Sequence, residues 1–409
     1  MRIKSYLVYL IAILCFQTSI AQEKTLFIGN SMTYFNDMPN LFEEIANDKG
    51  KDVQVEFHAP GGTGFVHHHV NNTVYNLFEN NTWDIVVLQP GTGESAGASH
   101  PVDVTIERGQ QMIDSIKKYS PCAKIFLYEI PYGIKATNNV PDYNDYHAIQ
   151  TIIRDSITKM ANGLQIPFVP AGESARNHLN NQDDLLLHNG YNDVHPNLNG
   201  SYLVASTMYA AIYQEEVSVS NYLGGVTQEN ATYFQNIADE VVLPNKADWL
   251  INTYNLYANF TGEENSYLTV NFTNLSTNYD SLEWDFGDGT TSTEENPIHI
   301  FTTEGVQEIE LKAIKENGCE EIIKREMIVG NLSTEDFDFN NFILYPNPVN
   351  DNLNLMASDN FSFKIINMLG QIVYKNSENK TEYTINLSHL ESGIYYVITK
   401  NKEFRIIKN

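Results

Sequence analysis

Two distant segments of the chain carry the side chains that nucleophilic catalysis needs. Ser31 follows the apolar run 26–28 and precedes a helix-like stretch over 38–46, so its hydroxyl is expected where a strand turns into a helix. Much later, the segment 192–197 places His195 just ahead of another apolar helix. A histidine can accept the serine proton and return it to a leaving group. The pair predicts a hydrolase with Ser31 as the nucleophile and His195 as the base.

The group that orients His195 is one of two neighbours. Asp193 is the nearest acid, two residues before the histidine, and Asn192 stands three residues before it. A carboxylate orients the imidazole and stabilises the imidazolium, whereas an amide can favour the wrong tautomer. We expect Asp193 to be the acid. The alternative is a Ser31–His195 dyad in which a backbone carbonyl orients the ring.

Donors for a developing oxyanion are expected near the same edge. The segment 60–64 contains Gly61 and Gly62, whose missing β-carbons let a backbone N–H approach a substrate closely. Gln89 ends the apolar run 85–88 and offers a side-chain amide. With the N–H of Ser31, these groups would form a three-donor oxyanion hole. Residues 34–37, which follow the nucleophile, are expected at the rim of the pocket.

A histidine cluster raises the question of a metal. The run 67–69 is all histidine, and His58 is near it in the sequence. Adjacent histidines point in different directions, so at most two could bind one ion, and no Cys, Asp or Glu with ligand spacing accompanies them. We expect a polar cleft lining or a solvated turn, with no metal and no cofactor.

Length, composition and the N-terminal segment predict an exported protein of several domains. Its 409 residues, 42% of them hydrophobic, predict two or three domains. Residues 1–21 are typical of a secretory signal peptide, and no later run is long and apolar enough for a transmembrane helix. The chain has 51 acidic and 25 basic residues, a net charge of −26, which argues against nucleic acid as a partner. Cys15 lies in the signal, and Cys122 and Cys319 fall in different predicted domains, so no disulfide framework is expected.

The elements that must position these residues alternate between strand and helix. Strands are predicted at 25–28, 53–57, 85–88, 124–127 and 167–169, and helices at 41–49, 104–119, 145–162 and 200–214. This alternation predicts a three-layer α/β/α domain over residues 22–254, with a parallel sheet covered on both faces. Ligands bind beyond the carboxyl ends of such strands, where Ser31 and Gln89 are expected.

The rest of the chain has the pattern of all-β domains. Short strand-like runs separated by turns predict one small sandwich over residues 255–330 and another over 342–409, with a polar linker at 331–341. In the first sandwich, residues 282–290 alternate apolar and polar side chains into an Asp-Gly turn, which indicates a hairpin.

Residues 25–252 resemble the SGNH, or GDSL-like, hydrolase family, in the branch that begins Ile-Gly-Asn-Ser. The resemblance implies that Ser31 is the nucleophile, that Gly61 or Gly62 donates to the oxyanion, and that His195 is the base. The family's late Asp-x-x-His has Asn192 at its acid position here. Its third block has Asn where this chain has Gln89, which keeps an amide donor but reaches one methylene further.

Two further resemblances cover the C-terminal part. The hexad Trp-Asp-Phe-Gly-Asp-Gly at 284–289 resembles that of a PKD domain, an immunoglobulin-like sandwich that implies a spacer or glycan-contacting role; Asp285 and Asp288 are expected to form the turn, with calcium binding as the alternative. Residues 341–409 carry Tyr-Pro-Asn-Pro at 345–348 and Gly-Ile-Tyr-Tyr at 393–396, which resemble the C-terminal sorting domain of the type IX secretion system. That resemblance implies passage through the periplasm and across the outer membrane, then release or surface attachment.

These patterns together predict a secreted serine esterase. The expected partners are the type IX secretion machinery and an acylated extracellular carbohydrate, with acetyl the favoured acyl group. One alternative is an inactive glycan-binding or adhesive protein on the same fold. Another is an esterase that acts on lipid or aryl esters.

Overall fold

A computed structural model describes most of the chain. The described residues are 22–218, 220–330, 343–367, 372–376, 380–390, 392–399 and 403–409. The expected signal segment 1–21 and the expected linker 331–341 lie outside them. The contacts within the chain divide it into two compact units, residues 1–329 and 330–409.

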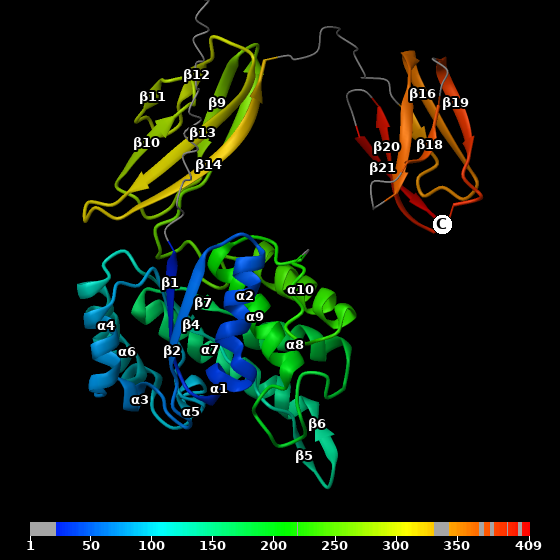
Figure 1. Cartoon of the computed structure of the whole chain (residues 1–409). Helices are drawn as coiled ribbons and strands as arrows, with labels where there is room; N and C mark the ends of the chain where they lie inside the picture. The colour runs from blue at the N-terminus through cyan, green and yellow to red at the C-terminus, as the bar shows by residue number, and fades with distance from the viewer. Residues whose placement is uncertain are drawn as a thin grey trace, which may run out of the picture. The chain divides into compact units, whose positions relative to one another are not determined.

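The first unit begins with a five-stranded parallel sheet in the order β2-β1-β3-β4-β7 (Figure 1). Its strands are β1 (Glu23–Ile28), β2 (Val53–His58), β3 (Ile85–Leu88), β4 (Lys124–Tyr128) and β7 (Phe168–Val169). The apolar runs in the sequence become these strands because a parallel sheet that is covered on both faces buries nearly every residue of its central strands. All four residues of β3, for example, are buried.

Helices cover both faces of this sheet. One group is α2 (Met38–Asp48), α8 (Ala171–Asn181), α9 (Leu198–Tyr213) and α10 (Gln228–Val242), in which α9 contacts the other three. The other is α3 (Phe65–His68), α4 (Asn72–Asn80), α6 (Val102–Tyr119) and α7 (Tyr143–Leu164), in which α6 contacts the other three. The three-layer α/β/α prediction is confirmed. None of the described helices is long and apolar enough to span a membrane.

The strand order creates one crevice at the carboxyl edge of the sheet. From β1 the chain proceeds to β2 on one side, and it then returns to β3 on the other side of β1. The carboxyl ends of β1 and β3 therefore flank the point where the winding direction changes, which is where ligands bind in sheets of this order. The short helices α1 (Ser31–Tyr34) and α5 (Thr92–Ser95) begin in the loops after these two strands.

Shorter elements complete the domain. They are the one-turn 3-10 helices η1 (Phe35–Asp37) and η2 (Leu243–Asn245) and the hairpin strands β5 (Lys135–Thr137) and β6 (Val140–Asp142). Of these, η1 follows α1 directly, and β5 and β6 lie between β4 and α7 in the chain.

A β-sandwich follows in the same unit. Its strands are β8 (Phe260–Ser266), β9 (Thr269–Asn274), β10 (Ser281–Asp285), β11 (Thr291–Ser292), β12 (Ile298–Ile300), β13 (Gly305–Ile314) and β14 (Glu320–Val329), in the sheets β11-β10-β13-β14 and β12-β9-β8. The predicted hairpin is confirmed as β10 and β11, with Trp284 opposite Ser292. Asp285 and Asp288 accept hydrogen bonds from Gly287 N and Thr290 N inside the turn, as expected of turn-forming residues.

The second unit is a separate small sandwich with its own core. Its strands are β15 (Ile343–Tyr345), β16 (Asn352–Phe361), β17 (Phe363–Asn367), β18 (Ile372–Lys375), β19 (Lys380–Asn386), β20 (Gly393–Thr399) and β21 (Glu403–Lys408), in the sheets β15-β16-β19 and β18-β17-β20-β21. Buried Leu353, Leu355, Ile365 and Val397 lie between the two sheets. The prediction of two small all-β domains after the α/β domain is confirmed.

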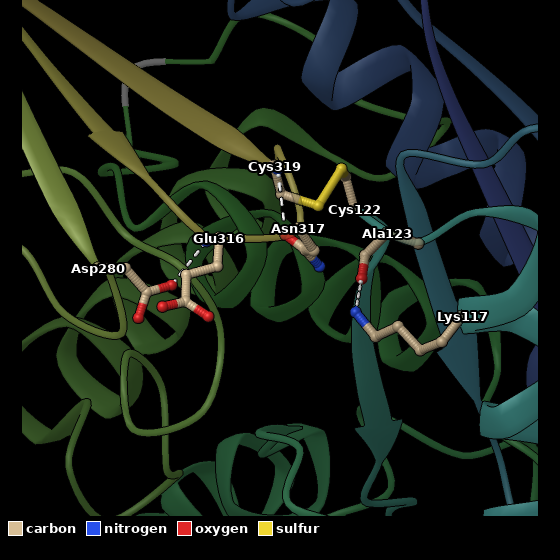
Figure 2. Close-up of a disulfide and its surroundings, with 7 residues drawn as sticks. All are labelled: Lys117, Cys122, Ala123, Asp280, Glu316, Asn317 and Cys319. Carbon is tan, nitrogen blue, oxygen red and sulfur yellow. Dashed lines mark hydrogen bonds between the residues drawn. A yellow bond between two sulfur atoms is a disulfide. The ribbon is translucent and has the colours of Figure 1, made fainter.

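A disulfide joins the α/β domain to the first sandwich (Figure 2). Cys122 and Cys319 are 197 residues apart in the sequence, and their Cα atoms lie 5.3 Å apart. The turn that carries Cys319 is held by hydrogen bonds from Cys319 N to Asn317 Oδ1 and from Glu316 N to Asp280 Oδ2. The expectation of no disulfide framework did not foresee this bond, because Cys122 and Cys319 lie in different domains and only folding brings them together.

Candidate active site

A continuous line of hydrogen bonds connects Ser31 with His195 and Asp193. His195 Nε2 lies 2.8 Å from Ser31 Oγ, and His195 Nδ1 lies 2.7 Å from Asp193 Oδ1. A carboxylate only accepts hydrogen bonds, so the proton on the ring belongs to Nδ1 and Nε2 is left with a lone pair. That lone pair faces the Ser31 hydroxyl, which is the arrangement needed to accept its proton.

Asp193 is held in its ionised form by the residue that it orients. Its Oδ1 also accepts the backbone N–H of His195 at 3.0 Å. This backbone hydrogen bond, followed by the one from the His195 ring, lowers the pKa of Asp193 below its usual value. Asn192 instead turns away: its side chain exchanges two hydrogen bonds with the backbone of Ala136 in the β5–β6 hairpin. The structure therefore places Asp193, and not Asn192, beside the imidazole.

Residues 34–37, expected at the pocket rim, fix the position of His195 against the nucleophile helix. The Phe35 ring stacks on the imidazole with centroids 4.1 Å apart and planes 14° apart. Asn36 has a φ of 51°, and its Nδ2 donates to Pro196 O at 3.0 Å and to Ser201 Oγ at 2.9 Å. Because these bonds tie the segment after Ser31 to the residues after His195, Ser31 and His195 are held as one assembly.

Asn30 shapes the turn that presents Ser31. Its side-chain Oδ1 accepts from Met32 N at 2.9 Å and caps α1, while its Nδ2 donates to Thr63 O at 2.7 Å. The Thr63 hydroxyl returns a hydrogen bond to Gly29 O at 2.9 Å. The Gly-Asn-Ser turn and the glycine-rich segment 60–64 are therefore bound to each other. Asparagine is favoured at this N-cap position because its oxygen satisfies an otherwise unpaired helix N–H.

Gln89 lies at the end of β3 as expected, but its amide has another partner. Its Oε1 accepts from Asn30 N at 2.9 Å and from Thr33 Oγ1 at 3.2 Å, and its Nε2 donates to Pro90 O. The side chain is only 1% exposed. A buried amide with these partners supports the Gly-Asn-Ser turn from behind, and its expected role as an oxyanion donor stays a prediction.

Gly61 and Gly62 lie in the loop after β2, next to the nucleophile turn. Gly62 has a φ of +72°, a conformation that strains other residues, and a β-carbon on Gly61 would lie 3.3 Å from the Tyr34 hydroxyl. Both glycines are exposed. Together with the N–H of Ser31 at the start of α1, their backbone N–H groups are candidates for an oxyanion hole.

Glu94 is a buried carboxylate that the sequence did not single out. It is 2% exposed, and its two oxygens accept four hydrogen bonds. Oε2 accepts from Phe65 N at 2.8 Å and from Gly91 N at 2.9 Å. Oε1 accepts from Val66 N at 3.0 Å and from Arg108 Nη1 at 3.2 Å. Glu94 thus joins the loop after β2 to the loop after β3.

The histidines near Gly64 make local contacts. His68 is fully buried, and its Nε2 lies 2.9 Å from Gly29 O; burial lowers the pKa of His68 to about 4. His67 Nδ1 accepts from Gly64 N at 3.2 Å, and His69 Nδ1 lies 2.8 Å from Phe65 O. Among the residues that the structure describes, no three His, Cys, Asp or Glu side chains are grouped as a metal ion would require.

An open hollow of about 310 Å³ lies beside the nucleophile turn. Segments after β1, β2 and β3 line it: Asn30, residues 62–64 with 66–67, and residues 91–94 with 99–100. Its accessible lining is mostly apolar, although Thr92, Ser99, His67 and His100 are among the lining residues. A ligand in this hollow would be next to the Ser31 turn.

Comparisons with known proteins identify the C-terminal part of the chain. Residues 252–329 match the model of the PKD domain, and residues 343–409 match that of the secretion system C-terminal sorting domain. The chain carries a PKD domain and a C-terminal sorting domain. Both resemblances seen in the sequence are thereby confirmed, and the sorting domain indicates export. No curated protein matches the chain.

The α/β domain is similar to several solved structures. A DUF4886 family protein from Bacteroides uniformis is 18% identical over 54% of this chain and 95% of its own, with a TM-score of 0.46. An SGNH hydrolase from Slackia heliotrinireducens, so described in its name, is 20% identical over 46% of this chain and 97% of its own, with a TM-score of 0.38. An acetyl xylan esterase is 22% identical over 46% of this chain and 99% of its own, with a TM-score of 0.35. Residues 25–252 resemble the same SGNH group by their sequence motifs.

Proposed function

We propose that this protein is a secreted serine esterase and that Ser31, His195 and Asp193 form its catalytic site. The observation that carries the proposal is the hydrogen-bonded line from Ser31 Oγ through the His195 ring to Asp193, at 2.8 and 2.7 Å. These three groups come from two loops 162 or more residues apart in sequence. A purely structural serine does not need an imidazole whose other nitrogen is held by a carboxylate, whereas a nucleophile does.

The reaction follows from these positions. Ser31 Oγ attacks the ester carbonyl carbon while His195 Nε2 takes the hydroxyl proton, and Asp193 stabilises the imidazolium that forms. The tetrahedral oxyanion would accept from the N–H of Ser31 and of Gly61 or Gly62. Collapse breaks the bond to the alcohol, which leaves with the proton from Nε2. Water, deprotonated by His195, then attacks the acyl-enzyme and releases the acid and free Ser31.

An acyl ester on extracellular carbohydrate is the favoured substrate, with acetyl as the acyl group. Export through a sorting domain brings the enzyme to extracellular material, and the PKD domain offers a spacer between the catalytic domain and its attachment. The hollow beside the Gly-Asn-Ser turn is open and not an enclosed tunnel, which suits the acyl group of a large carbohydrate better than a long acyl chain.

The test is ester hydrolysis by the full chain. We expect release of p-nitrophenol from its acetate, less from long-chain esters, and none above background with Ser31→Ala. Deacetylation of acetylated polysaccharides would then define the substrate. Equal activity of the wild type and Ser31→Ala, or inactivity of both on every ester tested, would favour the alternative of an inactive glycan-binding module. A preference for long acyl chains would favour the lipid-ester alternative.

Delivery by the type IX secretion machinery has its own test. Truncation after Leu344 removes the sorting domain apart from its first residues. The truncated protein is expected to accumulate in the periplasm, and fractionation of cells and medium measures this. Undiminished secretion of the truncated chain would contradict the assignment of the export route.

A further inference from the structure

The loops that carry the proposed oxyanion donors need a device that holds their backbones still. Hydrogen-bond donors stabilise a transition state only when they are fixed before the reaction, because a donor that must first reorganise contributes less. The glycine segment 60–64 is poorly suited to this alone, since glycine adds no side chain that packs. Something outside the segment has to fix it.

Glu94 occupies the place where such a device would lie. Its carboxylate is buried and fully satisfied, with two donors on each oxygen. Three of the four donors are backbone N–H groups, two from the start of α3 and one from Gly91 ahead of α5. The fourth is Arg108, whose guanidinium balances the charge inside the domain. His100 Nδ1 lies further off, at 4.0 Å.

The glycines around the carboxylate allow the two loops to approach it closely. A β-carbon on Gly64 would lie 2.3 Å from Glu94 Oε2 and 2.6 Å from Gly91 Cα. A β-carbon on Gly91 would lie 3.0 Å from the same oxygen. Gly64 directly follows Thr63, which is bonded to Asn30 of the nucleophile turn. The Glu94 carboxylate is thus linked, through the loop after β2, to Asn30 and so to both segments that carry the proposed oxyanion donors.

We infer that Glu94 is a positioning residue that clamps the segment 60–66 to the loop after β3 and so fixes the proposed oxyanion donors. The inference rests on the proposed function for its effect on turnover, but the clamp itself does not. Glu94 contacts no reacting atom, and its role is to hold backbone.

Glu94→Gln tests the clamp with little change in shape. The new NH₂ group must face either the two N–H groups on Oε2 or the N–H and guanidinium on Oε1, so two donors lose their acceptor. Hydrogen exchange followed by mass spectrometry is expected to quicken in peptides covering residues 61–69 and 89–97, and to stay unchanged in α10. Unchanged exchange in both loop peptides would overturn the inference, whether or not the protein is an esterase.

The catalytic readout separates positioning from general destabilisation. At a temperature where all variants are folded by circular dichroism, Glu94→Gln is expected to lower kcat about 10- to 100-fold, with KM within about 3-fold of the wild type. The matched control is Gln235→Met in α10, which removes buried hydrogen bonds to Tyr202 and Ser220 far along the chain from these loops. It is expected to lower stability and leave kcat unchanged.

The outcomes distinguish the two proposals. An active wild type with unchanged kcat in Glu94→Gln, or with an equal loss in Gln235→Met, would overturn the positioning role and leave the esterase intact. A wild type no more active than Ser31→Ala would overturn the esterase, and hydrogen exchange would still decide whether Glu94 holds the loops.

Discussion

Asp193 Oδ1 accepts hydrogen bonds from both the ring and the backbone of His195, at 2.7 and 3.0 Å, although only one residue separates the two. One carboxylate oxygen therefore fixes both the orientation of the imidazole and the position of the His195 backbone. Asn192, the residue before Asp193, has a φ of 66°, and its side chain has its own partner in the β5–β6 hairpin.

Exchange of the acid tests this assignment. Asp193→Asn keeps the shape but is expected to lower kcat about 10²- to 10⁴-fold, because an amide can stabilise the wrong tautomer and cannot stabilise the imidazolium. Ester hydrolysis at saturating substrate measures it. Asn192→Gly suits the positive φ and is the control, with kcat expected within about 3-fold of the wild type. The reverse pattern would make Asn192 the orienting group.

Loss of the Gln89 side chain is expected to act through stability. In Gln89→Met the buried N–H of Asn30 loses its acceptor, which costs about 1–3 kcal/mol. Urea unfolding should therefore show the loss, together with reduced activity. A fall in kcat of about 10²- to 10³-fold at unchanged stability is expected when an oxyanion donor is lost, and it would support that role for Gln89.

A methyl group at Gly64 should disrupt the junction of the two loops. Its β-carbon would lie 2.3 Å from Glu94 Oε2, so Gly64→Ala has to displace either the carboxylate or the loop. We expect lower thermal stability and at least about a 10-fold loss of kcat. Gly190→Ala is the control, because a β-carbon there meets nothing within 4 Å. Equal behaviour of the two variants would contradict the close packing described at Gly64.

His68 should make the fold sensitive to acid. Burial lowers its pKa from 6.5 to about 4, so the folded protein keeps it neutral while the unfolded chain protonates it near pH 6.5. Its contribution to stability is full above pH 6.5 and is lost as the pH falls towards 4. His68→Gln cannot titrate, so its urea midpoint should fall less between pH 7 and pH 5 than that of the wild type. Parallel falls would show that His68 is not responsible.

Reduction of the Cys122–Cys319 bond should destabilise the first unit. A bond that closes a loop this long is expected to contribute about 2–4 kcal/mol. Thermal unfolding in the presence of a reductant should therefore shift to lower temperature. The double variant Cys122→Ser, Cys319→Ser should match the reduced wild type and ignore the reductant. A reductant effect of equal size in that variant would show that the shift has another cause.

Local patterns were sufficient to predict much of this architecture and to single out Ser31 and His195. Alternating apolar runs and helical periodicity predicted the sheet, and the position of Ser31 directly after β1 depends only on that local pattern. The two C-terminal domains were predictable because their turn motifs are contiguous. Asp193 was expected as the acid on chemical grounds, but its two hydrogen bonds to His195 and the different partner of Asn192 are visible only in the structure.

Other features depend on contacts that no local pattern reports. Gln89 was correctly placed at the end of β3, but its partners depend on which way a flexible side chain turns. Glu94 has the sequence setting of an ordinary acid in a polar loop, because its burial arises from the loop after β2 and from Arg108 of α6. The pairing of Cys122 with Cys319 depends on how two domains meet, and a spacing of 197 residues carries no sign of it.

The disulfide also restricts how the α/β domain can be oriented relative to the PKD domain. Cys122 lies two residues before β4, at the amino edge of the sheet, whereas Ser31 and Gly91 lie at the carboxyl edge. The PKD domain is therefore joined to the α/β domain by the chain itself and by the disulfide at the edge opposite Ser31. Two covalent connections restrict the relative rotation of the two domains more than a single chain connection would. A partner that binds the PKD domain would therefore limit the orientation of the α/β domain and leave the edge that carries Ser31 accessible.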